Sequence, residues 1–168
     1  MAQQFAVIGL GRFGMSVART LSELGQEVFA IDVDEDKVQR IAPVVTHAVV
    51  ADVTDIEAMR SIGIRNVDVA VITVGSEVKA SMVGTMVLRE LGVRTIVAKA
   101  NDDLHGKVLE KLGADRVVYP ERDGGSRLAR VLTSTNLIEQ IDLDPDYSIV
   151  EMTAPSSLAG KSLAELAV

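Results

Sequence analysis

Residues 5–14 read FAVIGLGRFG, a short apolar segment followed by a glycine-rich loop. The apolar segment is typical of a buried β-strand, and the loop has the GxGxxG spacing that joins such a strand to a helix. In this setting Gly9 allows the tight turn, Gly11 lets the backbone approach a pyrophosphate, and Gly14 lets the helix pack on the strand. The free N–H groups at the start of the helix would then face phosphate oxygens. The stretch therefore predicts a nucleotide-binding site in an α/β fold.

Similar apolar segments recur along the chain, and helical patterns lie between them. Most of the segments are rich in Val, Ile and Ala without polar alternation, which is typical of parallel strands covered on both faces. The predicted strands are Phe5–Ile8, Val28–Ile31, His47–Ala51, Val67–Val74, Thr95–Lys99 and Arg116–Tyr119. Their alternation with helices predicts a Rossmann-like, doubly wound parallel sheet of six strands.

Local signals mark where the predicted helices begin and end. Glycines that can take the left-handed conformation follow four helical segments, at Gly25, Gly63, Gly92 and Gly113. Asp34 is the expected N-cap of one helix, and Thr54 with Glu57 forms the capping-box pattern of another. Asn101 is the expected cap of the helix that follows the fifth strand.

The composition changes near residue 140. Three aspartates flank Pro145, which indicates an exposed turn or linker, and Ser148–Thr153 has the pattern of a strand. One strand and part of a helix cannot form a core alone. We therefore expect a nucleotide-binding domain over residues 1–140, with 141–168 forming a linker and the beginning of a small, truncated C-terminal subdomain.

The composition also excludes several classes of protein. The 168 residues include no cysteine, which excludes disulfides, zinc ribbons and thiol catalysis. Lys and Arg number 17 against 24 Asp and Glu, so the net charge of −7 and the scarcity of aromatic residues disfavour nucleic acid as a partner. No apolar run approaches the roughly 18 residues that span a bilayer. His47 and His105 lack metal-ligand spacing, so we predict structural roles for both and no transition-metal site.

Two aspartates follow predicted strands at the edge where such sheets bind ligands. Asp32 ends the second strand, and its carboxylate could accept hydrogen bonds from both hydroxyls of an adenosine ribose while repelling a 2′-phosphate. This predicts that NADP is disfavoured. Asp52 follows the third strand, where it could accept from the adenine amino group or serve only in a turn, and the residues leave both alternatives open.

Cationic side chains are predicted near the phosphates of the nucleotide. Arg12 lies inside the glycine loop, where its planar fork suits the terminal phosphate of ATP or ADP; the alternative is a solvated surface arginine. Lys99 ends the fifth strand at the same edge of the sheet and is a second candidate. Phe13 completes the loop between Arg12 and Gly14.

The sequence lacks the equipment that most nucleotide-dependent enzymes carry. No GxxxxGK[ST] motif for phosphoryl transfer is present, and the residues after about 140 are too few for a substrate domain. These features favour a nucleotide sensor over an enzyme. The alternative is an NAD-dependent oxidoreductase or its cofactor-binding fragment.

Several motifs together resemble the RCK domain, also called KTN or TrkA-N, and more narrowly the regulatory subunits of bacterial potassium uptake systems of the Ktr and Trk type. Besides the glycine loop and Asp32, the resemblance rests on residues 46–49 (THAV), 63–66 (GIRN), 107–115 (KVLEKLGAD) and 119–122 (YPER). It covers roughly residues 3–135, and residues 146–151 (DYSIVE) resemble the start of the family's C-terminal subdomain.

The resemblance implies a mechanism as well as a fold. Members of the family pair as dimers, usually within an octameric ring on the cytoplasmic face of a membrane potassium-translocating subunit. ATP and ADP favour different ring shapes and so gate potassium flux, and NAD is a further candidate ligand. By motif match, Arg12 would reach the γ-phosphate, Asp32 would bind the ribose, and Asp52 would lie near the adenine. Glu121, which physical reasoning alone assigns to the dipole of a helix start, would help to hold Mg²⁺ or Ca²⁺ near the phosphates.

Overall fold

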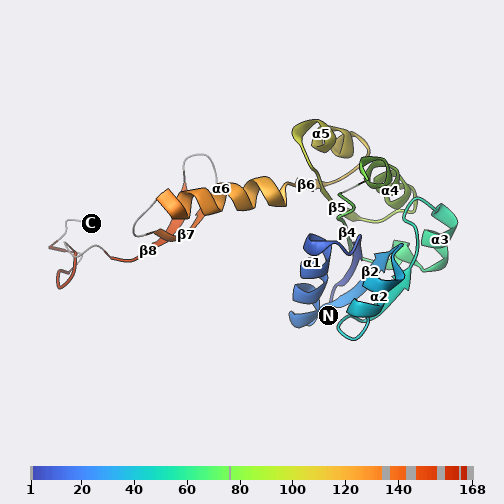
Figure 1. Cartoon of the computed structure of the whole chain (residues 1–168), viewed down its shortest axis with the longest axis horizontal. Coiled ribbons are helices and arrows are strands. Elements are labelled where there is room, and N and C mark those ends of the chain that lie inside the picture. Colours follow the sequence, from blue (N-terminus) through green and yellow to red (C-terminus); the bar gives the residue numbers. More distant parts are fainter. Residues whose placement is uncertain are drawn as a thin grey trace. The chain divides into compact units, whose positions relative to one another are not determined.

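The computed structural model describes residues 2–75, 77–133, 137–142, 147–154, 158–162 and 164–165. It contains a six-stranded parallel sheet with strand order β3-β2-β1-β4-β5-β6 (Figure 1). The strands are β1 (Gln4–Ile8), β2 (Glu27–Asp32), β3 (His47–Val50), β4 (Val69–Ile72), β5 (Thr95–Lys99) and β6 (Arg116–Val118). The chain runs outward through β1, β2 and β3 and then returns to place β4 on the other side of β1. The predicted doubly wound sheet is therefore confirmed, with its switch point between β1 and β4.

Helices cover the sheet because each buries an apolar stripe against it. They are α1 (Arg12–Glu23), α2 (Glu35–Ile41), α3 (Ile56–Ser61), the 3₁₀ helix η1 (Ile64–Asn66), α4 (Val78–Glu90) and α5 (Asp103–Lys111). One core cluster joins α1 and α2 to the sheet through residues such as Ala18 and Ile41. A second, larger cluster joins the sheet to α3, η1, α4 and α5. The sheet is thus the middle of three layers.

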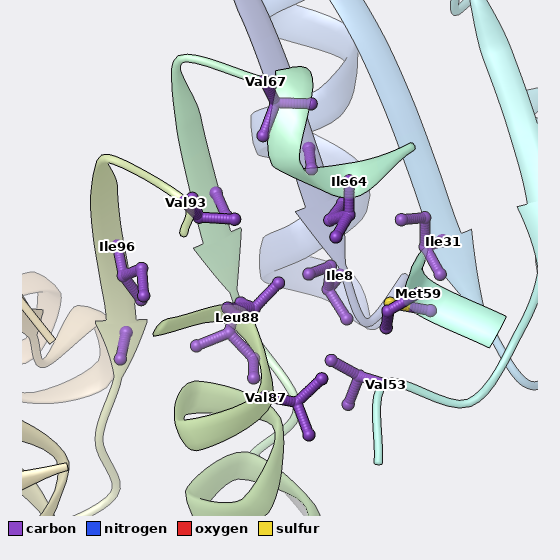
Figure 2. Close-up of a cluster of buried hydrophobic side chains, with 14 of the residues drawn as sticks. Ile8, Ile31, Val53, Met59, Ile64, Val67, Val87, Leu88, Val93 and Ile96 are labelled. Carbon is purple, nitrogen blue, oxygen red and sulfur yellow. The ribbon is translucent and has the colours of Figure 1, made fainter. Parts of the chain in front are cut away.

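Figure 2 shows side chains of the larger cluster gathered between the sheet and the elements α3, η1 and α4. Met59 of α3, Leu88 of α4 and the strand residue Ile96 are each fully buried within it. A Cβ added at Gly84 of α4 would lie 2.7 Å from Ile72 Cδ1, which leaves no room for a side chain there. This close approach fixes α4 against the strand that leads into the candidate site.

The helix ends confirm some of the local predictions and correct others. The glycines after the four helical segments have positive φ, namely 75° at Gly25, 74° at Gly63, 82° at Gly92 and 107° at Gly113. Asp34 caps α2 by accepting from the N–H groups of Asp36 and Lys37.

Two predicted caps are wrong by one residue. Asp55, not Thr54, caps α3 by accepting from the N–H groups of Glu57 and Ala58. Asp102, not Asn101, caps α5. In both places the aspartate has the extended backbone conformation of an N-cap, so its carboxylate receives the free N–H groups at the helix start.

The contacts divide the chain into two units, Met1–Pro120 and Glu121–Val168. Helix α6 spans Pro120–Thr133, and β7 (Leu137–Asp142) pairs antiparallel with β8 (Ser148–Met152). The strand expected at Ser148–Thr153 is confirmed, β7 was not expected, and residues 143–146 of the predicted linker lie outside the described residues. The division into domains 1–140 and 141–168 stays a prediction. Within the part of the chain that the structure describes, no helix is long and apolar enough to cross a membrane.

Candidate functional site

The candidate site lies at the carboxyl edge of the sheet, where three central strands end at one level. Ile8 of β1 is in register with Ile31 of β2 and with Ile72 of β4. The next residues, Gly9, Asp32 and Thr73, therefore come side by side at the switch point. The ladder continues through them, since Gly9 N donates to Ile31 O at 2.8 Å and Thr73 N donates to Ile8 O at 2.8 Å.

The glycine loop is held closely against the end of β4. Gly9 has a φ of 92°, and a Cβ there would lie 2.9 Å from the backbone nitrogen of Val74. A Cβ at Gly14 would overlap the carbonyl oxygen of Gly9 and the Thr73 hydroxyl, which itself donates to that oxygen at 2.5 Å. Among the described residues, and leaving aside its two neighbours in the chain, Gly11 has no heavy atom within 4 Å of its Cβ position. Gly9 and Gly14 are therefore required by packing, whereas Gly11 presents open backbone at the start of α1.

Asp32 ties the end of β2 to this loop. The residue is 8% exposed, and its Oδ2 accepts from the backbone N–H of Leu10 at 2.5 Å. Its Oδ1 accepts from the N–H of Asp34 at 2.9 Å and lies 3.4 Å from Lys37 Nζ. The carboxylate is thus fixed beside the loop that would hold the phosphates, which is the placement that ribose recognition needs.

Sequence reasoning missed Thr73 and Lys37. Thr73 lies inside the predicted strand Val67–Val74, so the sequence gives it no role beyond that of a strand residue, and only the register places its hydroxyl against Gly9. Lys37 comes directly after the acidic residues 34–36. It lies three residues after Asp34 and forms an ion pair with that residue at 3.5 Å. That i,i+3 spacing on a predicted helix was a usable signal.

Asp52 is exposed and serves in a turn. Its Oδ1 accepts from both the N–H and the hydroxyl of Thr54, each at 2.8 Å. This is one of the two roles left open by the sequence. The adenine contact stays a prediction.

The two predicted cations lie on different elements of the same edge. Arg12 is exposed at the first position of α1, followed by the half-buried Phe13. Lys99 ends β5, and its Nζ would lie 3.2 Å from a Cβ placed on Gly75, in the loop after β4. Asn101, expected as a cap, instead donates to the carbonyl of Gly75 at 2.6 Å. Lys99 and Asn101 therefore contact the β4 loop, which in turn contacts the glycine loop at Val74.

Glu121 lies in the first turn of α6, within the second unit. Among the described residues, no three His, Cys, Asp or Glu side chains form a group that could hold a metal ion. The metal-binding role of Glu121 stays a prediction.

The two histidines differ in environment. His47 is exposed on β3, with its ring centroid 4.6 Å from that of Phe29. His105 is 4% exposed in α5, and its Nδ1 accepts from the N–H of Asn101 at 3.3 Å. Burial lowers the pKa of His105 from its ordinary value, although the Asp102 carboxylate acts in the opposite direction. Burial and the hydrogen bond that Nδ1 accepts both favour the neutral ring, and this contact joins α5 to the end of β5.

This burial makes the stability of the fold depend on pH. Below the ordinary histidine pKa of 6.5 the unfolded chain takes up a proton that the folded chain resists. We expect the free energy of unfolding of the wild-type chain to fall as the pH drops below 6.5, and to fall less steeply in His105→Asn. Urea unfolding at a series of pH values measures both slopes, with His47→Asn as the exposed control. Equal slopes for wild type and His105→Asn would contradict this account of His105.

The comparisons with known proteins agree with this architecture. The TrkA-N domain model matches residues 5–120. The chain is 47% identical over 166 residues to the Ktr system potassium uptake protein C of Bacillus subtilis (strain 168), covering 99% of this chain and 75% of that protein.

Solved structures show the same fold. The TrkA-N domain of inner membrane protein ybaL from Escherichia coli aligns with a TM-score of 0.68 and 19% identity, covering 79% of this chain and 96% of that one. The GsuK channel bound to NAD aligns with a TM-score of 0.64 and 17% identity over 74% of this chain and 23% of that one. GsuK bound to ADP aligns with a TM-score of 0.62 and 16% identity, covering 73% of this chain and 32% of that one.

The family model matches most of the chain, the Ktr protein is 47% identical to it, and the solved structures share its topology. These findings agree with the motifs at the glycine loop and at Asp32. The chain belongs to the TrkA-N, or RCK, domain family, and within it to the relatives of the Ktr system potassium uptake proteins.

Proposed function

We propose that this chain is a regulatory subunit that senses adenine nucleotides and gates a potassium transporter or channel. The observation that carries the proposal is the buried carboxylate of Asp32, fixed beside the glycine loop by the 2.5 Å hydrogen bond from Leu10 N–H. That pair supplies a ribose acceptor next to a phosphate-binding helix start. ATP or ADP is the proposed ligand, and NAD, which shares their adenosine half, is a further one.

The relatives support regulation over catalysis. The Ktr relative is a potassium uptake protein, and GsuK, whose structures hold NAD or ADP, is a channel. The alternative, an NAD-dependent oxidoreductase or its fragment, is supported only by a fold that many nicotinamide enzymes share. Turnover of NADH by the purified chain would favour this alternative.

The proposed subunit acts in an assembly. We place it as a dimer, within an octameric ring, on the cytoplasmic face of a membrane potassium-translocating subunit. Helix α6 supports self-association, because it carries exposed leucines at Leu128 and Leu132, one helical turn apart. Apolar side chains at this spacing form a stripe that a second helix can cover.

A divalent cation is part of the proposal. The tail of a bound ATP adds negative charge to a chain of net charge −7, so a carboxylate near it is favourable only when a cation lies between them. Glu121 is the proposed ligand, and Mg²⁺ or Ca²⁺ suits an oxygen donor in a chain without cysteine.

Arg12 is the residue that would distinguish the two nucleotides. If its guanidinium reaches the γ-phosphate, Arg12→Ala should weaken ATP binding by about 1.5–3 kcal/mol, the contribution of a hydrogen bond to a charged group, and leave ADP binding unchanged. A ligand shifts a two-state assembly only through its differential affinity, so the variant should also respond equally to both nucleotides. Calorimetry measures the affinities, and potassium flux into vesicles that contain the membrane subunit measures the response.

Arg19 provides the control, since it is also exposed on α1 but lies two turns further along the helix. Arg19→Ala should keep the wild-type preference. Equal losses of ATP and ADP affinity in Arg12→Ala would place Arg12 away from the γ-phosphate. A wild-type flux indifferent to the choice of nucleotide would contradict the regulatory role.

A further inference from the structure

Lys37, in the first turn of α2, lies beside the carboxylate that we assign to the ribose. Its Nζ is 3.4 Å from Asp32 Oδ1 and 3.5 Å from Asp34 Oδ2. The Lys37 side chain is 33% exposed and that of Asp32 only 7%. The ammonium group is therefore a partly solvated neighbour of a buried acceptor.

Donors of the protein itself take most of the acceptor positions of Asp32. A carboxylate has about four lone-pair positions, two on each oxygen. Leu10 N–H takes one on Oδ2, while Asp34 N–H and Lys37 Nζ take both on Oδ1. These donors, all from described residues, leave one position. A ribose diol brings two hydroxyl donors, so one more position must become available.

Lys37 is the donor that can leave. The two backbone donors are held by the glycine loop and by the start of α2, at 2.5 Å and 2.9 Å. The 3.4 Å contact of Lys37 is longer than the roughly 2.7–2.9 Å of a well-formed charged hydrogen bond. The ammonium also keeps a second partner, because Asp34 Oδ2 lies 3.5 Å away.

We propose that Lys37 is a displaceable occupant of Asp32 Oδ1 and so determines how strongly the site selects a ribose diol; this inference rests on the proposed binding of adenine nucleotides. When a nucleotide binds, one ribose hydroxyl takes the position on Oδ1 and the ammonium moves toward Asp34. Displacing Lys37 offsets part of what that hydroxyl gains. Lys37 is thus a specificity-determining residue. It lowers the preference of the site for a ribose over a sugar that lacks the 2′ and 3′ hydroxyls.

The test compares ADP with 2′,3′-dideoxy-ADP by calorimetry on wild type and on Lys37→Met. The ratio of the two dissociation constants isolates the hydroxyls, since attraction between Lys37 and the phosphates acts on both ligands alike. We expect the preference for ADP to rise about three- to tenfold in Lys37→Met, the equivalent of one hydrogen bond freed from competition. Lys37→Arg, whose fork binds a carboxylate more firmly, should lower the preference below that of wild type.

Two controls show whether the effect passes through Asp32. Arg40→Met removes a cation from the same helix, but Arg40 Nε donates to the carbonyl of Asp36 at 3.2 Å, so the preference should not change. In an Asp32→Asn background, Lys37→Met should also leave the preference unchanged. Thermal unfolding of each variant confirms that the fold is retained, and Lys37→Arg keeps the charge if Lys37→Met is unstable.

The outcomes separate this inference from the function on which it rests. An unchanged preference in Lys37→Met would reduce Lys37 to an ordinary ion pair, and a lowered one would mean that Lys37 holds Asp32 in place for the ribose. Either result, with normal ADP binding by wild type, overturns the inference alone. A wild-type chain that binds neither ligand overturns the proposed function and this inference together.

Discussion

Gly14→Ala is expected to destabilise the nucleotide-binding unit by about 3 kcal/mol, at the upper end of the usual effect of overpacking. The added Cβ would overlap the carbonyl oxygen of Gly9 and the hydroxyl of Thr73. Neither can easily retreat, because they are joined by a 2.5 Å hydrogen bond and Gly9 is itself tied to β2. Urea unfolding measures the loss.

Gly11→Ala in the same loop is the matched control. Its φ of −69° suits any residue, and no described residue other than its two neighbours in the chain has a heavy atom within 4 Å of the Cβ position. Stability should therefore stay within about 0.5 kcal/mol of wild type, as for a substitution away from packed groups. Nucleotide affinity should still fall, because the methyl group would lie where the pyrophosphate approaches the backbone. Equal stabilities for Gly14→Ala and Gly11→Ala would contradict the packing that we describe.

Asp32→Asn should weaken the binding of ATP, ADP and NAD alike, by about 1–3 kcal/mol, because each loses charged hydrogen bonds from its ribose hydroxyls. The loss should be similar for all three, since they share the adenosine half. Asparagine has nearly the same shape as aspartate, but its amide NH2 group must face the backbone N–H of either Leu10 or Asp34. Thermal unfolding of the variant therefore accompanies the affinity measurement, to show that the loop is retained.

Asp36→Asn is the matched control for charge. Asp36 is exposed on α2 and contributes its backbone, not its carboxylate, to the contacts described there. This variant should bind all three nucleotides as wild type does. Calorimetry on both variants measures the difference, and unchanged ATP affinity in Asp32→Asn would remove Asp32 from the site.

Most of the fold could be predicted because its signals are local. Continuous apolar strands, glycines after helices and the GxGxxG spacing each act within a few residues, and together they specify a doubly wound sheet. The one-residue errors at Thr54 and Asn101 have the same origin. At each position the predicted cap is followed by an aspartate, Asp55 after Thr54 and Asp102 after Asn101. Either residue of a pair can accept the free N–H groups of the helix, and only the backbone conformation decides between them.

The candidate site was predictable where the motif sets the position, and not where tertiary contacts do. Asp32 is identified by its distance from the glycine loop. Thr73 reaches that loop only through the register of β4 against β1, which no local pattern encodes. Lys37 of α2 donates to the carboxylate of Asp32 at the end of β2, and the turn between the two elements brings these side chains together. Long-range register and side-chain pairing are thus the parts that required the structure.

The central claim is that the loop Gly9–Gly14 and Asp32 together bind an adenine nucleotide through a free ribose diol. Calorimetry of the wild-type chain with ATP, ADP, NAD and NADP tests it most directly. The account predicts that the first three bind and that NADP does not, because its 2′-phosphate would meet the carboxylate of Asp32 where a hydroxyl is expected. NADP binding as tight as that of NAD, or no binding by any of the four, would contradict it.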